Sequence, residues 1–364
     1  MASGIKKTPL FEMHITRGAK MAPVSGWNLP LYYYEGVAGE QKHAREGAAV
    51  IDSCHAYKFR IAGKGAAAAL DALLACPAAD QAVGTVRTNF LLNDKGGVAD
   101  ELLVCAMAAE DFFLIAHAGG TAKVLQDALP AEAAFQDLSE LLGKIDLLGP
   151  AADAVLVELD VPEEELPEND GCKSAAVAEI PCILIRHDLA AESGYELCFA
   201  ADYAEDMWAI LLDTEPVLPA GQGAWDALRI EAGQPRLGGE LTAVTSLIHA
   251  GLAPLLRMDE FPERNFTGKE ALLDLAGERK LTGIILEGRR TARAGSKIIK
   301  DGQEIGVVTG GAYSPVLGSA VVMGWVDAAF AEMDTAVEVL AGDVSLSGSV
   351  SSLPLIEYGD DGDC

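Results

Sequence analysis

Residues 93–104 read NDKGGVADELLV and decide how this part of the chain folds. The first five are turn-forming residues, and the remainder has the composition of a β-strand. Because side chains alternate along a strand, Val98, Asp100, Leu102 and Val104 share one face. An acid therefore interrupts an apolar face. Two interpretations of Asp100 stay open: a structural carboxylate bonded to backbone N–H groups, and a carboxylate that takes part in chemistry.

The segments around this stretch predict antiparallel strands and helices. TNFLLN precedes the turn, and FFLIAHA follows VADELLVCAM after a second turn at AAED. TAKVLQDAL reads as a helix capped by Thr121, and upstream a strand in KFRIAG is followed by an Ala/Leu-rich helix. The order strand, helix, three strands, helix is typical of an α+β fold rather than of alternating βαβ units.

The rest of the chain divides into recognisable segments. TPLFEMHITRGAKMAPVSGWNLPLYY is expected to form extended chain and turns. CILIRH and YELCFA read as strands joined by the loop DLAAESG, and GAWDALRIEAG reads as a helix ending at Gly233. From about Lys280, short strands with turn signals predict a small β-barrel, with Asp301 and Gly302 as a hairpin turn.

Composition excludes several function classes. The 364 residues suffice for two or three domains, and the formal net charge of −28 disfavours nucleic acid and anionic membrane as partners. The seven cysteines are scattered, without CxxC pairs or zinc-ligand spacing, so we expect no metal site and a reducing compartment. No secretory signal and no run of about 20 apolar residues is present, which predicts a cytoplasmic protein that does not cross a membrane.

Several motifs together resemble the T-protein, the aminomethyltransferase family of the glycine cleavage system. The resemblance extends over roughly residues 8–355. Its motifs are TPLFEMH with GAKMAPVSGWNLPLYY, HAREGAAVIDSCH, LLNDKGGVADELLV, LRIEAGQPRLGGEL, FTGKEAL and GVVTGGAYSPVLGSAVVMGWV. The third of these matches the family signature Asn-x-x-Gly-Gly-x-x-Asp-Asp. Six motifs in register over this length are hard to explain by chance.

The resemblance implies an α+β fold of three domains in a cloverleaf, with two mixed α/β domains and a C-terminal small β-barrel around a channel for tetrahydrofolate. The implied reaction takes an aminomethyl group from the lipoyl arm of H-protein, releases ammonia and leaves methylenetetrahydrofolate. We expect a discontinuous folate-binding domain at residues 1–52 and 145–275, a second α+β domain at residues 53–144 that carries Asp100, and the barrel at residues 276–364.

The resemblance also assigns roles to two acids. Asp100 aligns with the family's catalytic aspartate, which positions the pterin N5 and N10 nitrogens and helps to move protons as ammonia leaves. Glu192 aligns with the acid that hydrogen-bonds the pterin ring, whose adjacent N–H donors suit a carboxylate. We therefore expect Asp100 to be catalytic and Glu192 to bind the cosubstrate.

Other positions of the implied folate pocket differ from the family. Leu189 replaces a tyrosine, and Trp225 replaces the arginine that holds the glutamate tail of folate. Ala56, Thr88 and His117 replace a methionine, a tyrosine and an asparagine. Two glycines of the Arg-x-Gly-Tyr-Thr-Gly-Glu segment are also missing. Tryptophan cannot form a bidentate pair with a carboxylate, but it can stack on an aromatic ring.

Three alternatives stay open. A changed pocket around a retained acid also suits a folate-dependent demethylase of a small methylated compound, or a non-catalytic folate-binding scaffold. His117 could be a structural, hydrogen-bonded histidine rather than a cosubstrate ligand. An anion clamp could come from other arginines, although salt-bridged roles are the commoner fate of such side chains; these are Arg229, Arg236 and Arg257.

Overall fold

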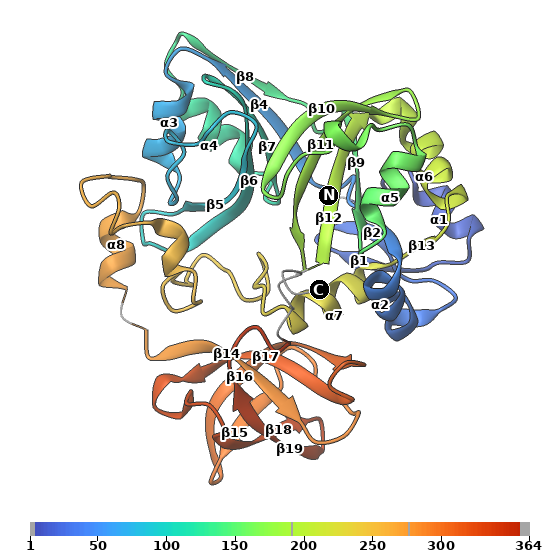
Figure 1. The fold of residues 1–364 in the computed structure, drawn as a ribbon. Coiled ribbons are helices and arrows are strands. Elements are labelled where there is room, and N and C mark those ends of the chain that lie inside the picture. Colours follow the sequence, from blue (N-terminus) through green and yellow to red (C-terminus); the bar gives the residue numbers. More distant parts are fainter. Residues whose placement is uncertain (1–3, 191, 276, 357–364) are drawn as a thin grey trace. The chain divides into compact units, whose positions relative to one another are not determined.

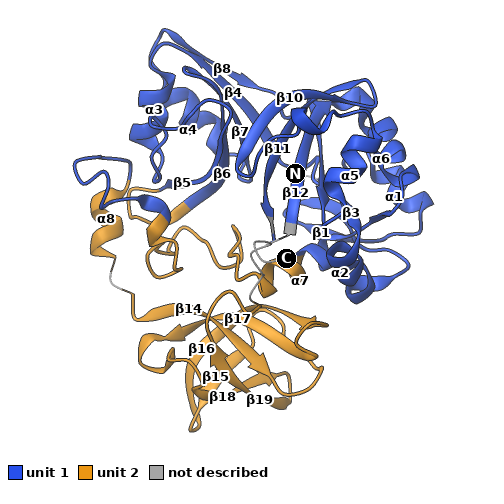
Figure 2. Ribbon diagram, viewed as in Figure 1, with its two compact units in different colours: residues 1–92, 99–225, 255–267 blue, residues 93–98, 226–254, 268–364 orange. Residues whose placement is uncertain are grey.

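The structure of the protein is a computed structural model that describes residues 4–190, 192–275 and 277–356. The chain forms two compact units (Figure 2). Unit 1 contains residues 1–92, 99–225 and 255–267, and unit 2 contains residues 93–98, 226–254 and 268–364. Among the described residues, no helix is both long enough and apolar enough to cross a membrane.

A five-stranded sheet in unit 1 carries the stretch that follows the glycine pair. Its strand order is β5-β6-β7-β4-β8, with two helices, α3 and α4, packed on it (Figure 1). The elements are β4 (Tyr57–Gly63), α3 (Ala66–Leu73), β5 (Val86–Leu92), β6 (Val98–Ala108), β7 (Asp111–Ala116), α4 (Thr121–Ala128) and β8 (Ala133–Asp137). Leu102 and Val104 of β6 pack with Leu70 of α3 and Leu125 of α4 in one apolar core. The face that includes Asp100 is therefore the face that the helices cover.

A six-stranded sheet, also in unit 1, has the order β10-β11-β12-β9-β3-β13. Its strands are β3 (Ala48–Asp52), β9 (Leu142–Leu148), β10 (Gly171–Val177), β11 (Ile180–Leu189), β12 (Glu192–Ala200) and β13 (Val217–Pro219). The helices of this part are α1 (Phe11–Thr16), α2 (Gly36–Glu46), α5 (Ala152–Glu158) and α6 (Ala204–Asp213), and a hairpin is formed by β1 (Lys20–Val24) and β2 (Trp27–Tyr32). Alternate residues of β9 and β12, such as Leu147 and Leu197, pack with Trp208 of α6 in the core.

The second face of each sheet contributes to a shared apolar cluster within unit 1. Leu103 and Cys105 of β6 and Ile115 of β7 meet Ile185 of β11 and Cys198 of β12 in this cluster. These residues alternate along their strands with the residues that face the helices, as the period of two requires. We call this layer the inter-sheet cluster. The burial of Cys105 and Cys198 confirms that both are small core residues.

Unit 2 contains the predicted barrel. Six strands close in the order β14-β17-β16-β15-β18-β19. They are β14 (Arg279–Leu286), β15 (Lys297–Lys300), β16 (Gln303–Ser314), β17 (Ser319–Asp327), β18 (Ala336–Ala341) and β19 (Val344–Ser351), and α8 (Lys269–Asp274) precedes them. Asp301 and Gly302 have φ angles of 50° and 78°, which confirms a tight hairpin turn between β15 and β16. Helix α7 (Gln222–Glu231) ends near Gly233, whose φ of 67° suits a helix terminus.

Three local predictions were wrong. Residues 11–16 form the short helix α1, not extended chain. Thr121 does not cap α4, because Gly120 is at the N-cap and the Thr121 hydroxyl donates to Asp100 instead. The segment DLAAESG is not a loop, because pairing of β11 with β12 continues to Leu189 and Glu192. In each case a contact distant in sequence replaced the local preference.

The packing of Leu114 predicts a large loss of stability on truncation. This β7 side chain is completely buried in the core beneath α3 and α4. Leu114→Ala should lower the free energy of unfolding by about 2–5 kcal/mol, because lost burial adds to an unfilled cavity. Urea denaturation measures the change. Val124→Ala on α4, where the side chain is 40% exposed, should change it by no more than about 0.5 kcal/mol. Equal effects of the two substitutions would contradict the core assignment.

Candidate functional site

The Asp100 carboxylate lies fully buried at the start of β6 and accepts hydrogen bonds from four groups. Its Oδ1 accepts the N–H groups of Glu101 at 2.8 Å, His117 at 3.1 Å and Ala118 at 3.1 Å. Its Oδ2 accepts the Thr121 hydroxyl at 2.5 Å and also lies 3.1 Å from the Ala118 nitrogen. Asp100 therefore joins the beginning of β6 to the turn that leads from β7 into α4.

These contacts give Asp100 the structural role that the sequence left open as one alternative. A carboxylate offers about four lone-pair positions, and the four donors engage both oxygens, with the Ala118 N–H shared between them. Burial raises the pKa of Asp100 to about 6, although the Thr121 hydroxyl and the backbone donors act in the opposite direction. A carboxyl group with this pKa changes its protonation state just below neutral pH. It therefore combines a fixed position with the capacity to exchange a proton.

His117 follows the last residue of β7 and has a side chain that reaches solvent. The surrounding protein removes enough water from the imidazole to lower its pKa although the side chain is still partly open to solvent, and the nearby Lys144 ammonium lowers this pKa further. His117 is therefore neutral at pH 7. Phe113 and Ile115, which alternate with Leu114 on β7, face the inter-sheet cluster, so His117 continues that face. The His117 side chain and the Asp100 carboxylate thus lie on different faces of the sheet, although the His117 N–H binds Asp100.

His55 is a site candidate that the sequence reasoning missed. Its imidazole lies beside the Trp27 ring, and its buried Nδ1 has no hydrogen-bond partner among the described residues. Desolvation lowers the pKa of His55 to about 4, so the ring is neutral. His117 is among the groups whose charge acts on it. Its place in DSCH, just after a strand, was the only signal available in the sequence.

An ionic network lies buried on the inter-sheet face of the six-stranded sheet. Lys144 Nζ of β9 lies 2.5 Å from Asp146 Oδ1 and 3.0 Å from Glu196 Oε2 of β12. Glu196 Oε1 lies 2.9 Å from His187 Nε2 of β11, and the Ser53 hydroxyl donates to Asp146 Oδ2 at 2.5 Å. Figure 1 shows β9, β12 and β11 side by side. We call Lys144, Asp146, Glu196 and His187 the ionic network.

The electrostatics of the ionic network favour the charged forms of Lys144 and Glu196, whereas burial raises the pKa of Asp146. Burial alone would lower the pKa of Lys144, but Asp146 and Glu196 outweigh it and raise this pKa above its usual value. Burial would raise the pKa of Glu196, but Lys144 and His187 lower it to about 2. Glu196 is therefore ionised at neutral pH, and His187 Nε2 must carry the hydrogen of their shared bond.

The structure brings some of the predicted cosubstrate positions together on one face. Ala56 is buried in the inter-sheet cluster, and Thr88 of β5 is half-buried two residues after Val86, which is also in that cluster. These two positions and His117 share the inter-sheet face. Trp225 comes from a different element, α7, and is half-buried.

The hairpin between β11 and β12 carries the remaining two predicted positions. Leu189 ends β11, Glu192 begins β12, and their backbones pair. Their side chains lie outside the described residues, so the predicted contacts of both stay predictions.

The three arginines considered as an anion clamp are all engaged in ion pairs. Arg229 is buried with Asp226 at 2.6 Å and Glu240 at 2.9 Å. The other two also pair with carboxylates, Arg236 with Asp226 and Arg257 with Asp80 and Glu260. The salt-bridged interpretation is confirmed.

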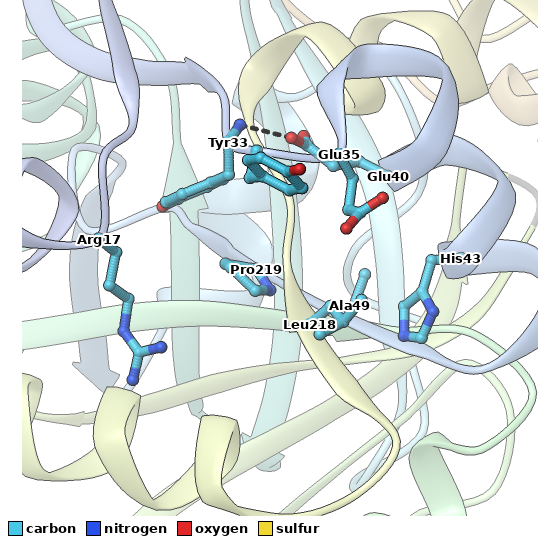
Figure 3. A pocket seen from close by; sticks show the side chains of 9 residues that line it. Arg17, Tyr33, Glu35, Glu40, His43, Ala49, Leu218 and Pro219 are labelled. Carbon is cyan, nitrogen blue, oxygen red and sulfur yellow. Dashed lines mark hydrogen bonds between the residues drawn. The ribbon is translucent and has the colours of Figure 1, made fainter.

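A cavity of about 330 Å³ lies elsewhere in unit 1. Arg17 and His43 stand at opposite ends of the view in Figure 3, with Pro219 and Ala49 between them. The buried Glu40 carboxylate beside it accepts the N–H groups of Tyr33 at 2.5 Å and Gly221 at 2.8 Å. None of the predicted site residues lines this cavity. Within residues 4–190, 192–275 and 277–356, no cluster of His, Cys, Asp and Glu side chains has the arrangement of a metal site.

The ionic network predicts a strong effect of removing its central cation. Lys144→Met should lower the free energy of unfolding by about 3–5 kcal/mol, because two buried carboxylates lose their counter-ion. Chemical denaturation at pH 7 measures it. The matched control is Lys123→Met, whose pair with Asp127 is exposed and worth at most about 1 kcal/mol. A Lys144→Met protein as stable as the control variant would contradict the network.

Comparisons with known proteins cover nearly the whole chain. The GCVT N-terminal domain family matches residues 10–260, and the glycine cleavage T-protein C-terminal barrel domain family matches residues 279–357. The chain is 33% identical to an aminomethyltransferase of Saccharopolyspora erythraea, over 97% of this chain and 98% of that protein. It is 34% identical to an aminomethyltransferase of Thermus thermophilus, over 97% of this chain and 99% of that protein.

A solved structure agrees with the sequence comparisons. The crystal structure of the glycine cleavage system aminomethyltransferase T from Bartonella henselae matches with a TM-score of 0.89 and 29% identity. The match covers 97% of this chain and 98% of that one. Both the mixed α/β part and the closed barrel are thus accounted for. The chain therefore belongs to the glycine cleavage T-protein family of aminomethyltransferases.

Proposed function

We propose that the chain transfers an aminomethyl group from the lipoyl arm of H-protein to tetrahydrofolate in glycine cleavage, with release of ammonia. The observation that carries this proposal is the end-to-end similarity to aminomethyltransferases, which leaves no major part of the chain unmatched. The chain is accordingly a transferase with tetrahydrofolate as cosubstrate. We place it in the cytoplasm, and the six described cysteines, all free and buried, agree with a reducing compartment.

We assign the catalytic role to Asp100, whose carboxylate lies on the helix-covered face and meets the turn at His117 and Ala118, where the two faces of the sheet adjoin. Its four hydrogen bonds hold the carboxylate in one orientation, and its raised pKa of about 6 suits a group that accepts a proton near neutral pH. The same bonds hold the backbone of His117 and Ala118 in place. Asp100 thus acts on proton movement and on the position of the adjoining turn. An aspartate with an ordinary pKa would be a weaker proton acceptor.

The cosubstrate contacts are assigned to both sheets. Glu192 at the start of β12 is assigned to the pterin ring, and Leu189, which stands where the family has a tyrosine, is assigned to the same pocket. Neutral His117 supplies a donor and an acceptor at the end of β7, beside Ala56 and Thr88 on the same face. This lining suits a neutral heterocycle, because none of these three side chains carries a formal charge at neutral pH.

Replacement of Asp100 tests its catalytic role. Asp100→Asn should lower kcat about 10²–10⁴-fold, because the amide cannot exchange the proton. In the wild type, kcat should rise with pH through about 6, since the raised pKa leaves Asp100 protonated below that value, and the variant should lack this step. The assay follows methylenetetrahydrofolate formed from aminomethyl-loaded H-protein.

The control for this test is another acid of the same sheet. Asp111→Asn removes an exposed pair with Arg60 at the other end of β7 and should leave kcat unchanged. Unchanged kcat in a folded Asp100→Asn protein would reduce Asp100 to its structural role. A wild type that consumes a methylated donor instead of the aminomethyl-loaded H-protein would favour the demethylase reaction.

Trp225 gives a second test of the folate assignment. In the proposed pose it stacks on the aminobenzoyl ring and leaves the glutamate tail without an arginine. Trp225→Arg should lower the Kd of tetrahydrofolate about 10-fold, because a charge-assisted pair with a carboxylate contributes about 1.5–3 kcal/mol. Calorimetry measures both proteins. A weaker Kd in the arginine variant would show that the tail does not reach α7.

A further inference from the structure

The hairpin between β11 and β12 turns tightly without a glycine. Leu189 pairs with Glu192 at the end of the ladder. Ala190, which follows Leu189, has a φ of 54°, which is the left-handed region that disfavours residues with a Cβ atom. The sequence from 186 to 193, RHDLAAES, contains no glycine that could relieve this. The pairing of β11 with β12 and the side chains along these strands therefore hold the hairpin in its conformation.

The ionic network supplies such a contact three pairs from the turn. His187 is opposite Gly194, which has no side chain, so the imidazole can reach across to Glu196 on the same face of β12. Glu196 is fixed in turn by Lys144, and Lys144 by Asp146. The four side chains are 18% exposed or less, with His187 the most exposed. The network thus connects β9, in the interior of the sheet, to the end of β11 that leads into the turn.

The other charged groups near His187 do not compete for its imidazole. Arg186 pairs with Asp153 of α5, and successive residues of β11 point to opposite faces. Asp188 is exposed and alternates away from His187 in the same manner. Glu196 is therefore the partner that faces the His187 ring, with Lys144 and Asp146 behind it.

We propose that His187 is a positioning residue, which through its bond to Glu196 fixes the hairpin that presents Glu192 to the pterin ring. The proposal rests on the function assigned above. It gives a residue outside the predicted pocket control over cosubstrate affinity. Loss of His187 leaves Glu196 still compensated by Lys144, so the fold persists while the hairpin loses its anchor. This separates His187 from Lys144, whose loss affects the whole network.

The test compares His187→Leu with His187→Gln. Leucine fills similar space without a donor, whereas the glutamine amide can still donate to Glu196. Hydrogen exchange of hairpin amides in the free protein should be about 10-fold faster in the leucine variant, the effect of one lost bond to a charged group. The KM for tetrahydrofolate should rise about 10-fold while kcat stays within about twofold, since the substrate-binding arm changes and the Asp100 turn does not.

Glutamine should restore both values to near wild type, which a general loss of packing would not allow. His43→Gln serves as the control histidine, because His43 binds the Pro216 carbonyl from α2, beside the separate cavity. It should change neither hairpin exchange nor KM. Both expected changes in His187→Leu, with rescue by glutamine, support the proposal.

The two readouts separate the possible failures. Unchanged hairpin exchange in His187→Leu overturns the anchoring, whatever the enzyme does with folate. Faster exchange with an unchanged KM overturns the link between the hairpin and the cosubstrate. A wild type that neither binds nor uses tetrahydrofolate overturns the assigned function and the folate part of this proposal, while the exchange experiment still reports on the hairpin.

Discussion

Charge buried between two sheets is the constraint on which unit 1 depends. Lys144, Asp146 and Glu196 lie on the face of the six-stranded sheet that meets the inter-sheet cluster, where unpaired charges would be costly. Each is tolerated only because the others are within hydrogen-bond distance, and this requires β9 and β12 in one register. A shift by one residue would turn all of these side chains to the helix-covered face. The network therefore specifies the pairing of the central strands.

Asp100 imposes a similar constraint on the five-stranded sheet. Its carboxylate accepts donors from β6, from the end of β7 and from the first turn of α4, and so holds three elements at one point. The same burial that makes these bonds necessary raises the pKa of the acid to about 6. Structure and chemistry are not alternatives at this position. The contacts that fix the carboxylate oppose this rise, so it is burial that gives Asp100 the raised pKa that a proton-transfer role needs.

The departures from the family pattern concern the positions assigned to cosubstrate binding and not the acid assigned to catalysis. The acid assigned to proton movement is retained, whereas the positions assigned to hold the cosubstrate differ. The family segment has glycines at the positions of Asp188 and Ala191, and the hairpin of β11 and β12 has Ala190, between them, in a left-handed conformation. In the proposal above, His187 and Glu196 secure the strand that leads into this turn. A changed turn with its own anchor points to a rebuilt cosubstrate pocket rather than to a lost one.

The sequence by itself determined the features that depend on local patterns. Strand alternation placed Val98, Asp100, Leu102 and Val104 on one buried face, and the Asp-Gly pair marked the barrel hairpin, because both follow from backbone periods and φ preferences. The motifs in register identified the family. The expected domain bounds, and the side-chain contacts of Leu189 and Glu192, remain predictions.

Tertiary structure alone decided which groups meet. Thr121 was expected to cap its own helix, but its hydroxyl found Asp100, a partner 21 residues earlier. The ionic network carries no motif, and its chemistry arises only when β9, β11 and β12 align. The loop predicted at DLAAESG became paired strand for the same reason. Local sequence sets which backbone conformations are low in free energy. Burial and long-range strand pairing decide which polar groups must form hydrogen bonds with one another.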